Sequence, residues 1–153
     1  MKLDEKAYPP AEVMSRISRA KNNLRTASAY AADDQAMQAD EAARKPRIAD
    51  IFALYAKKCR LAGAMDFDDL LLYTNILFQQ NPQILGFYRD RFRYILVDEY
   101  QDTNLAQYLI IKSLAQEHRN IAVVGDDAQS IYAFRGARIE NILNFTNDFP
   151  EAK

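Results

Sequence analysis

The sequence predicts an α/β fold in which an all-helical N-terminal subdomain precedes a small parallel β-sheet. Two apolar, β-branched segments, residues 94–98 and 121–125, each end abruptly in carboxylates. A stretch of helical length separates them, and this strand–helix–strand order predicts a right-handed crossover between two parallel strands. Strands of this kind often open into a nucleotide site at their carboxyl-terminal ends. We therefore predict a helical subdomain over residues 1–64 and an α/β part over residues 65–153.

Apolar residues at helical spacing predict the elements of the N-terminal subdomain. The first helix is expected to open at Pro10, because proline is tolerated in the first helical turn. Residues 26–46 are rich in alanine and small polar residues and predict one short helix and a loop. An amphipathic helix follows from 47 to 61, and Gly63 is suited to the left-handed stop just beyond it.

The α/β part alternates helices with the two strands. Asp66 is suited to cap the next helix, and the Asn-Pro pair that ends at Pro82 terminates it. The helices expected in this part run from about 67 to 79, 83 to 90, 105 to 116 and 138 to 147.

Composition and charge limit the class of protein. No apolar run is long enough to cross a bilayer, and the single cysteine, Cys59, fits a reducing cytoplasm. Residues 1–64 hold twelve Lys/Arg against eight Asp/Glu, and residues 65–153 hold eight against thirteen. A basic part joined to an acidic part suits polyanion binding beside a metal site. Three candidate polyanion contacts lie on the first predicted helix: Arg16, Arg19 and Lys21.

An adjacent pair of carboxylates, Asp98 and Glu99, follows the first strand. Such a pair can divide two tasks in phosphoryl transfer. One carboxylate holds a Mg²⁺ that bridges nucleotide phosphates, and the other accepts a proton from the attacking water. In isolation this dipeptide more often marks a strand end that simply turns polar.

The segment after the second strand carries more chemistry. Gln129 is an uncharged donor and acceptor suited to sensing a phosphate, and Arg135 can grip a carboxylate with two hydrogen bonds. Tyr132 and Phe134 offer stacking faces for unpaired bases, although an arbitrary pair of aromatic residues is more often part of a core.

Together these segments resemble motifs II and III of the superfamily 1 DNA helicases of the UvrD/PcrA/Rep type. The resemblance is carried by D-E-Y-Q-D-T-N (Asp98–Asn104) and G-D-D-A-Q-S-I-Y-A-F-R-G-A (Gly125–Ala137). Met65–Leu71 is similar to the acidic helix start that precedes motif II in that family. Ile17–Asn22 resembles the start of the family's helical insertion domain. The matches run in the family's order along nearly the whole chain.

The resemblance implies the helical insertion domain and the C-terminal half of the first RecA-like motor domain of an ATP-dependent helicase. Such a helicase would unwind DNA in the 3′-to-5′ direction during repair or replication. The implied cofactors are ATP and Mg²⁺, and the implied partners are single-stranded and duplex DNA. Asp98 would hold Mg²⁺, Glu99 would activate water, and Gln129 would contact the γ-phosphate.

The resemblance also implies that Tyr132 and Phe134 touch single-stranded DNA bases and that Arg135 steadies the catalytic glutamate. Two positions depart from the family pattern. Phe134 stands where many relatives carry tryptophan, so a stacking face remains without the indole N–H. Ala128 replaces a frequent third aspartate, which indicates that this carboxylate is dispensable.

A phosphate-binding loop is missing from these 153 residues. The pattern G-x-x-x-x-G-K-S/T cannot be assembled from the four glycines, Gly63, Gly86, Gly125 and Gly136. We interpret the chain as a middle fragment of a helicase that lacks the remainder of the motor and does not hydrolyse ATP alone. Without its P-loop strand, the sheet is expected to have unpaired edges and uncovered apolar faces. This predicts either self-association through the sheet, for example by swapping, or partial disorder.

Two other functions fit some of these residues. The chain could act as a DNA-binding module without ATPase activity, through the basic residues and aromatic rings named above. A Mg²⁺-dependent nuclease would use Asp98, Glu99, Asp126 and Asp127 as metal ligands. The nuclease ranks last, because it gives no purpose to the segment from Gln129 to Arg135.

Overall fold

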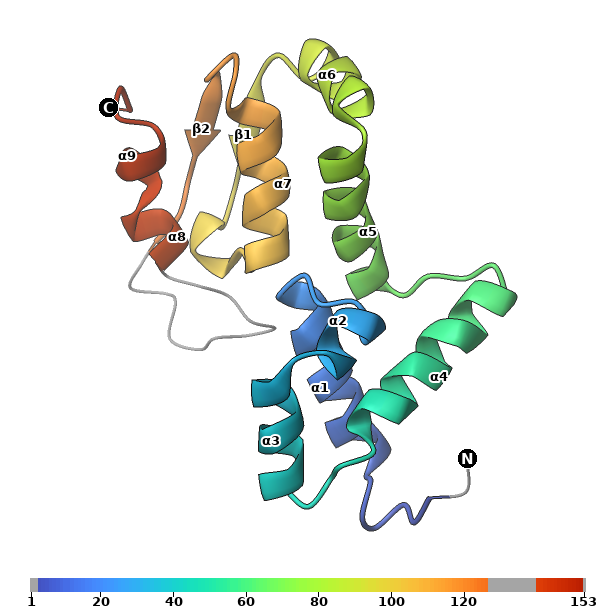
Figure 1. The fold of residues 1–153 in the computed structure, drawn as a ribbon. Helices are drawn as coiled ribbons and strands as arrows, with labels where there is room; N and C mark the ends of the chain where they lie inside the picture. Colours follow the sequence, from blue (N-terminus) through green and yellow to red (C-terminus); the bar gives the residue numbers. More distant parts are fainter. Residues whose placement is uncertain (1–2, 127–139, 153) are drawn as a thin grey trace. The chain divides into compact units, whose positions relative to one another are not determined.

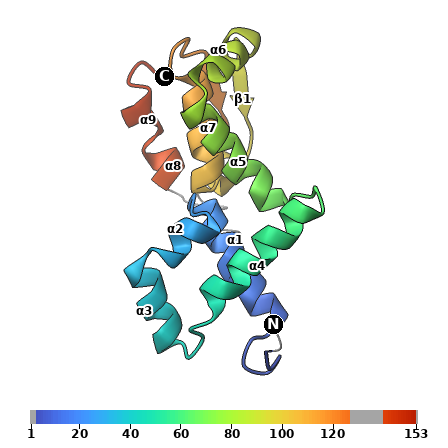
Figure 2. The ribbon, with the colours of Figure 1, turned by 45° about the vertical axis from the view of Figure 1, so that its right-hand side comes forward.

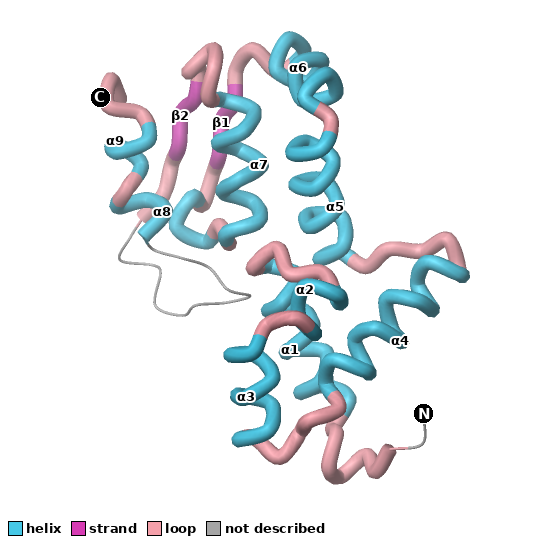
Figure 3. The backbone as a smooth tube through the Cα atoms, in the orientation of Figure 1, coloured by secondary structure: helices cyan, strands magenta, loops and turns pink. Residues whose placement is uncertain are grey.

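The computed structural model describes residues 3–126 and 140–152, and Figure 1 shows the order of their helices and strands. The chain divides into two compact units, Met1–Leu72 and Tyr73–Lys153. Helices dominate both, and the strands of the described residues form one two-stranded parallel sheet, drawn in magenta in Figure 3. The predicted α/β class with a helical N-terminal part is therefore confirmed.

The first unit is helical throughout its described residues. Its elements are α1 (Pro10–Asn22), α2 (Ala27–Ala31), α3 (Asp34–Ala42), α4 (Ile48–Leu61) and the start of α5 (Phe67–Gln80). Ile17, Ile48 and Phe52 are each 1% exposed and form the centre of its core. The Tyr30 ring meets the Phe52 ring edge-on, with centroids 6.0 Å apart, and so fastens α2 to α4.

Residues 26–46 form two helices, where the sequence predicted one and a loop. Each of the two has a side-chain N-cap. The Thr26 hydroxyl accepts a hydrogen bond from the Ala29 amide at 3.2 Å, and the Asp33 carboxylate accepts one from the Ala36 amide at 3.1 Å. The prediction was wrong because these two local caps start separate short helices in a segment with weak apolar periodicity.

The predicted junction between α4 and α5 is confirmed. Gly63 adopts a left-handed conformation with φ of 60°, which glycine reaches without a steric penalty. Asp66 caps α5, since its Oδ1 accepts a hydrogen bond from the Asp69 amide at 2.8 Å. These two residues turn the chain from one helix into the next.

The second unit contains the sheet and the helices that follow and precede it (Figure 2). After the rest of α5 come α6 (Pro82–Arg91), β1 (Ile95–Val97), the 3₁₀-helix η1 (Tyr100–Asp102), α7 (Leu105–Ala115), β2 (Ile121–Val123), α8 (Glu140–Leu143) and α9 (Phe145–Asp148). Helix α7 is the predicted crossover between the two parallel strands, which pair with Ile95 opposite Ile121 and Val97 opposite Val123. The single helix predicted to end near 147 is two short helices over its described residues.

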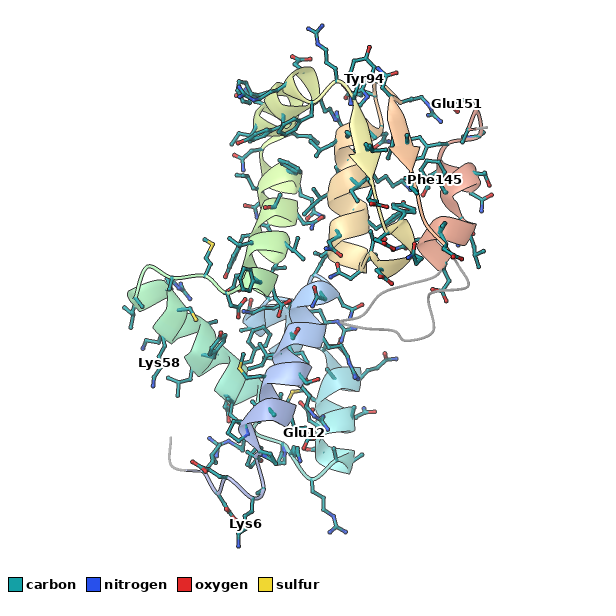
Figure 4. All side chains as sticks on the ribbon, turned by 180° about the vertical axis from the view of Figure 1, so that it is seen from behind. Lys6, Glu12, Lys58, Tyr94, Phe145 and Glu151 are labelled. Atoms are coloured by element: carbon teal, nitrogen blue, oxygen red, sulfur yellow. The ribbon has the colours of Figure 1, made fainter. Side chains whose placement is uncertain are left out.

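One face of the sheet is exposed. Leu96 on β1 is 75% exposed and Val124 after β2 is 57% exposed, while their neighbours Ile95 and Val97 are half-buried. Tyr94, labelled just before β1 in Figure 4, is 84% exposed. The predicted uncovered apolar face is confirmed. None of the described helices is long and apolar enough to span a membrane.

Candidate functional site

The predicted acidic pair lies directly after β1. Asp98 and Glu99 are both exposed, so both carboxylates are accessible from solvent. Glu99 has a left-handed backbone, with φ of 51° and ψ of 43°. This conformation is uncommon outside glycine and asparagine and costs free energy unless the surroundings hold it. The Glu99 backbone amide donates a hydrogen bond to Asp98 Oδ1 at 2.9 Å, which links the two residues of the pair.

Backbone hydrogen bonds fasten this acidic turn to the end of β2. The Val124 amide donates to the Val97 carbonyl at 2.8 Å, and the Tyr100 amide donates to the Val124 carbonyl at 2.9 Å. Because the strands are parallel, their carboxyl-terminal ends share one edge of the sheet. The turn after β1 and the segment that begins at Asp126 therefore start side by side.

A buried amide joins these two segments. The Gln101 side chain is 1% exposed. Its Nε2 donates to Glu99 Oε2 at 2.7 Å, and its Oε1 accepts from the Asp126 amide at 3.0 Å. Gln101 was not among the site residues that the sequence predicted. The one feature of the sequence that could have pointed to Gln101 is its place two residues after Glu99, a candidate catalytic carboxylate.

The helix that follows is anchored by caps and by α8. Asn104 and Gln107 form a reciprocal capping box at the start of α7. Thr103 Oγ1 donates to the Tyr100 carbonyl at 2.7 Å, which closes the 3₁₀ turn. The buried Asn141 amide of α8 donates to the Thr103 carbonyl at 2.9 Å. These hydrogen bonds connect the residues that follow the acidic turn to the start of α7 and to α8.

The predicted site residues of the segment after β2 lie outside the described residues. They are Gln129, Tyr132, Phe134 and Arg135, together with the Asp127 of the nuclease alternative. Over residues 3–126 and 140–152, no group of three or more His, Cys, Asp or Glu side chains is placed to hold a metal ion. A magnesium ligand at Asp98 stays a prediction.

Two of the predicted DNA contacts line an open depression of the first unit, with a volume of about 610 Å³. Arg16 pairs with the buried Asp40 at 2.7 Å and with Glu12 at 3.3 Å, so carboxylates already offset its charge. Arg19 is exposed, and none of the ion pairs found among the described residues involves it. Arg19 is the cation of this depression that is most available to an anion.

Lys21, the third predicted DNA contact, is 1% exposed. Its Nζ lies 2.7 Å from Asp66 Oδ2 and 2.7 Å from Asp69 Oδ1, and 5.0 Å from the centre of the Tyr55 ring. The Tyr55 hydroxyl donates to Asp66 Oδ2 at 2.8 Å. The ammonium thus has its partners inside the first unit, where it joins α1 to the start of α5.

Burial and pairing oppose each other in this cluster. Burial disfavours the ammonium of Lys21, but hydrogen bonds and charges from Asp66 and Asp69 outweigh it and raise the Lys21 pKa. Burial likewise works against the charged Asp66. The hydrogen bonds from Lys21, the Asp69 amide and Tyr55 outweigh burial and lower the Asp66 pKa. Both groups are therefore held charged in the folded state.

Acidification is expected to destabilise the first unit through Asp66. Its folded pKa lies below the ordinary value of 3.8, so its contribution to stability is complete above that value and is lost as pH falls through the folded pKa. Circular dichroism melting curves between pH 7 and pH 2 measure this loss. In Asp66→Asn the melting temperature should start lower and vary less with pH. An equal pH dependence in both proteins would contradict the assignment.

Comparison with known proteins decides the family. The family model of the UvrD/REP helicase N-terminal domain matches residues 1–150. The chain belongs to the UvrD/REP helicase family. The acidic pair after β1 and the segment after β2, which carry the resemblance in sequence, therefore lie within a match that spans nearly the whole chain.

Relatives within the UvrD/REP helicase family are similar over the same length. The chain is 44% identical to an "ATP-dependent DNA helicase PcrA" of Leuconostoc citreum over 153 residues, which are 99% of this chain and 20% of the relative. It is 45% identical to a "DNA helicase II" of Rickettsia typhi over 98% of the chain and 22% of the relative. A PcrA of Staphylococcus aureus is 43% identical over 98% of the chain and 20% of the relative. The chain spans about a fifth of the length of these relatives.

Proposed function

We propose that the chain comprises the helical insertion subdomain (1–64) and the C-terminal half of the first motor domain (65–153) of an ATP-dependent DNA helicase. The observation that carries the proposal is the exposed acidic turn at Asp98 and Glu99, bonded to the end of the neighbouring parallel strand. Identities of 43–45% to proteins named as DNA helicases support it. We further propose 3′-to-5′ unwinding and a cytoplasmic location.

The acidic turn suits two roles in ATP hydrolysis. Asp98 presents a hard carboxylate to solvent, and Mg²⁺ is typically held by one or two carboxylates together with water and nucleotide phosphates. A bound Mg²⁺ would offset the negative charge of the phosphates. Glu99 accepts a proton from the attacking water, with its carboxylate held by the Gln101 amide. Gln129 contacts the γ-phosphate, and Arg135 steadies the glutamate.

Two groups of residues bind DNA in the proposed function. Tyr132 and Phe134 stack on unpaired bases, each contributing roughly 1–3 kcal/mol. Arg19, which none of the described ion pairs involves, and Arg16 attract the phosphate backbone of single-stranded or duplex DNA. Lys21 does not belong to this group, because its ammonium is buried between carboxylates.

The test compares the chain alone with a chimera in which it replaces the matched fifth of the Leuconostoc citreum relative. The chain alone should release no phosphate from ATP above background, because it has no G-x-x-x-x-G-K-S/T loop. The chimera should hydrolyse ATP, faster with single-stranded DNA, and Tyr132→Ala with Phe134→Ala should reduce that stimulation. Turnover by the isolated chain, or a folded chimera without any, would refute the proposal.

We also propose that the isolated chain associates with itself through the exposed face of the sheet. Tyr94, Leu96 and Val124 supply the apolar surface. Sedimentation velocity should show dimers or larger species that increase with concentration and decrease in Leu96→Lys. A compact monomer at high concentration would contradict this. The nuclease alternative ranks last, because it gives no purpose to the segment from Gln129 to Arg135.

A further inference from the structure

Gln101 is buried at the point where the ends of both strands meet. Its side chain is 1% exposed, although it lies between two exposed carboxylates in sequence, Glu99 and Asp102. It reaches both strand ends at once, through Glu99 Oε2 at 2.7 Å and the Asp126 amide at 3.0 Å. A buried polar side chain with both ends occupied is held in one conformation.

A primary amide is suited to this pair of contacts at neutral pH, because it carries both a donor and an acceptor. A carboxylate oxygen accepts a hydrogen bond and a backbone N–H donates one, so the bridging side chain must donate at one end and accept at the other. The same chemistry fixes which end of the Gln101 amide is nitrogen. Glutamate here would place a second carboxylate against Glu99, and methionine would fill the space without either bond.

A glycine makes room for the bridge. A Cβ added to Gly125 would lie 2.4 Å from Gln101 Oε1 and 2.9 Å from Ile142 Cδ1. The Gly125 backbone does not have a positive φ, so the requirement for glycine here is spatial. The Gln101 amide can therefore approach the end of β2 only because residue 125 has no side chain.

We propose that Gln101 is a positioning residue that orients the Glu99 carboxylate for catalysis and links it to the backbone at Asp126. The inference rests on the proposed role of Glu99 as the base that activates water. Glu99 itself needs such a partner, because the residue is exposed and its carboxylate would otherwise be free to rotate. Gln101 is 1% exposed, so it acts through Glu99 and not by direct contact with substrate.

The link to Asp126 can be tested on the chain alone by amide hydrogen exchange. Gln101→Met keeps the volume and removes both hydrogen bonds. The Asp126 amide should then exchange about fivefold to tenfold faster, the factor expected from the loss of one neutral hydrogen bond. The Val124 amide, which donates to Val97, should exchange at an unchanged rate. Gln116→Met, at an exposed position after α7, is the matched control.

The effect on catalysis is measured in the chimera. Gln101→Met should lower kcat for ATP by roughly tenfold to a hundredfold and leave KM nearly unchanged, because misplaced catalytic groups cost rate and Gln101 makes no contact with substrate. Gln101→Glu should regain activity as pH falls, since a protonated carboxyl donates a hydrogen bond to Glu99 again. A residue that only maintained the fold would show no such pH profile.

A second variant, at Gly125, tests the same link without replacing Gln101. Gly125→Ala retains Gln101 but displaces its amide, so it should reproduce the fall in kcat and the faster exchange at Asp126. Unchanged exchange at Asp126 in a folded Gln101→Met chain would overturn the proposal. An unchanged kcat in a chimera that Glu99→Gln inactivates would also overturn it. If Glu99→Gln also leaves kcat unchanged, Glu99 is not the catalytic base. The exchange rate of the Asp126 amide then still shows whether Gln101 links Glu99 to Asp126.

Discussion

Glu99→Gln is expected to lower the kcat of the chimera for ATP by about 10²- to 10⁴-fold, the range typical of general base catalysis. The amide that replaces the carboxylate has nearly the same shape but cannot take a proton from water. KM for ATP should change little, because the substitution removes a group that acts in the transition state. Steady-state phosphate release with saturating single-stranded DNA measures both constants.

A control in the same turn separates catalysis from general charge effects. Asp102→Asn makes the same change of carboxylate to amide at an exposed position three residues along, and it should leave kcat within about twofold. The thermal stability of the Glu99→Gln chain should stay close to that of the wild type. Equal losses in the two variants, or full activity in Glu99→Gln, would show that Glu99 is not the base.

Lys21→Met is expected to destabilise the first unit by roughly 3–5 kcal/mol. Removing one partner of a buried ion pair leaves the other charge uncompensated, and here two carboxylates, Asp66 and Asp69, would remain. The loss should appear as a lower midpoint in urea unfolding. The slope of the transition should stay the same, because the same surface is exposed on unfolding.

The matched control for Lys21 is Lys58, an exposed lysine of α4 labelled in Figure 4. Lys58→Met should change the free energy of unfolding by no more than about 0.5 kcal/mol. Adding Asp66→Asn and Asp69→Asn to Lys21→Met should recover part of the lost stability, because the uncompensated charges are removed. A Lys21→Met chain as stable as Lys58→Met would show that the buried pairs do not support the fold.

Much of the fold follows from local patterns in the sequence. The β-branched run before Asp98 and the one before Gly125 predicted the two strands, and the helix-length stretch between them predicted their parallel pairing. Gly63 and Asp66 marked a helix end and a helix start correctly. These signals act over a few residues, so they can be read without knowing what packs against them.

The segment from 26 to 46 was predicted less well, for a physical reason. Its helices are short, and most helical stability in proteins comes from packing of an apolar face. Tyr30 and Ala36 are buried in the core of the first unit, but they are too few to set up a helical period. The caps at Thr26 and Asp33 were visible in the sequence and were the better guide.

The sequence alone determined the family resemblance, the acidic pair at Asp98 and Glu99, and the absence of a phosphate-binding loop, because each is a property of residues close together in the chain. The tertiary structure decided which polar groups meet. Lys21 faces a carboxylate 45 residues away, and Gln101 accepts a hydrogen bond from an amide 25 residues away. Such partners depend on how helices and strands pack. Because a buried polar group without a partner is costly, packing decides which groups pair, and residue spacing in the sequence does not show this.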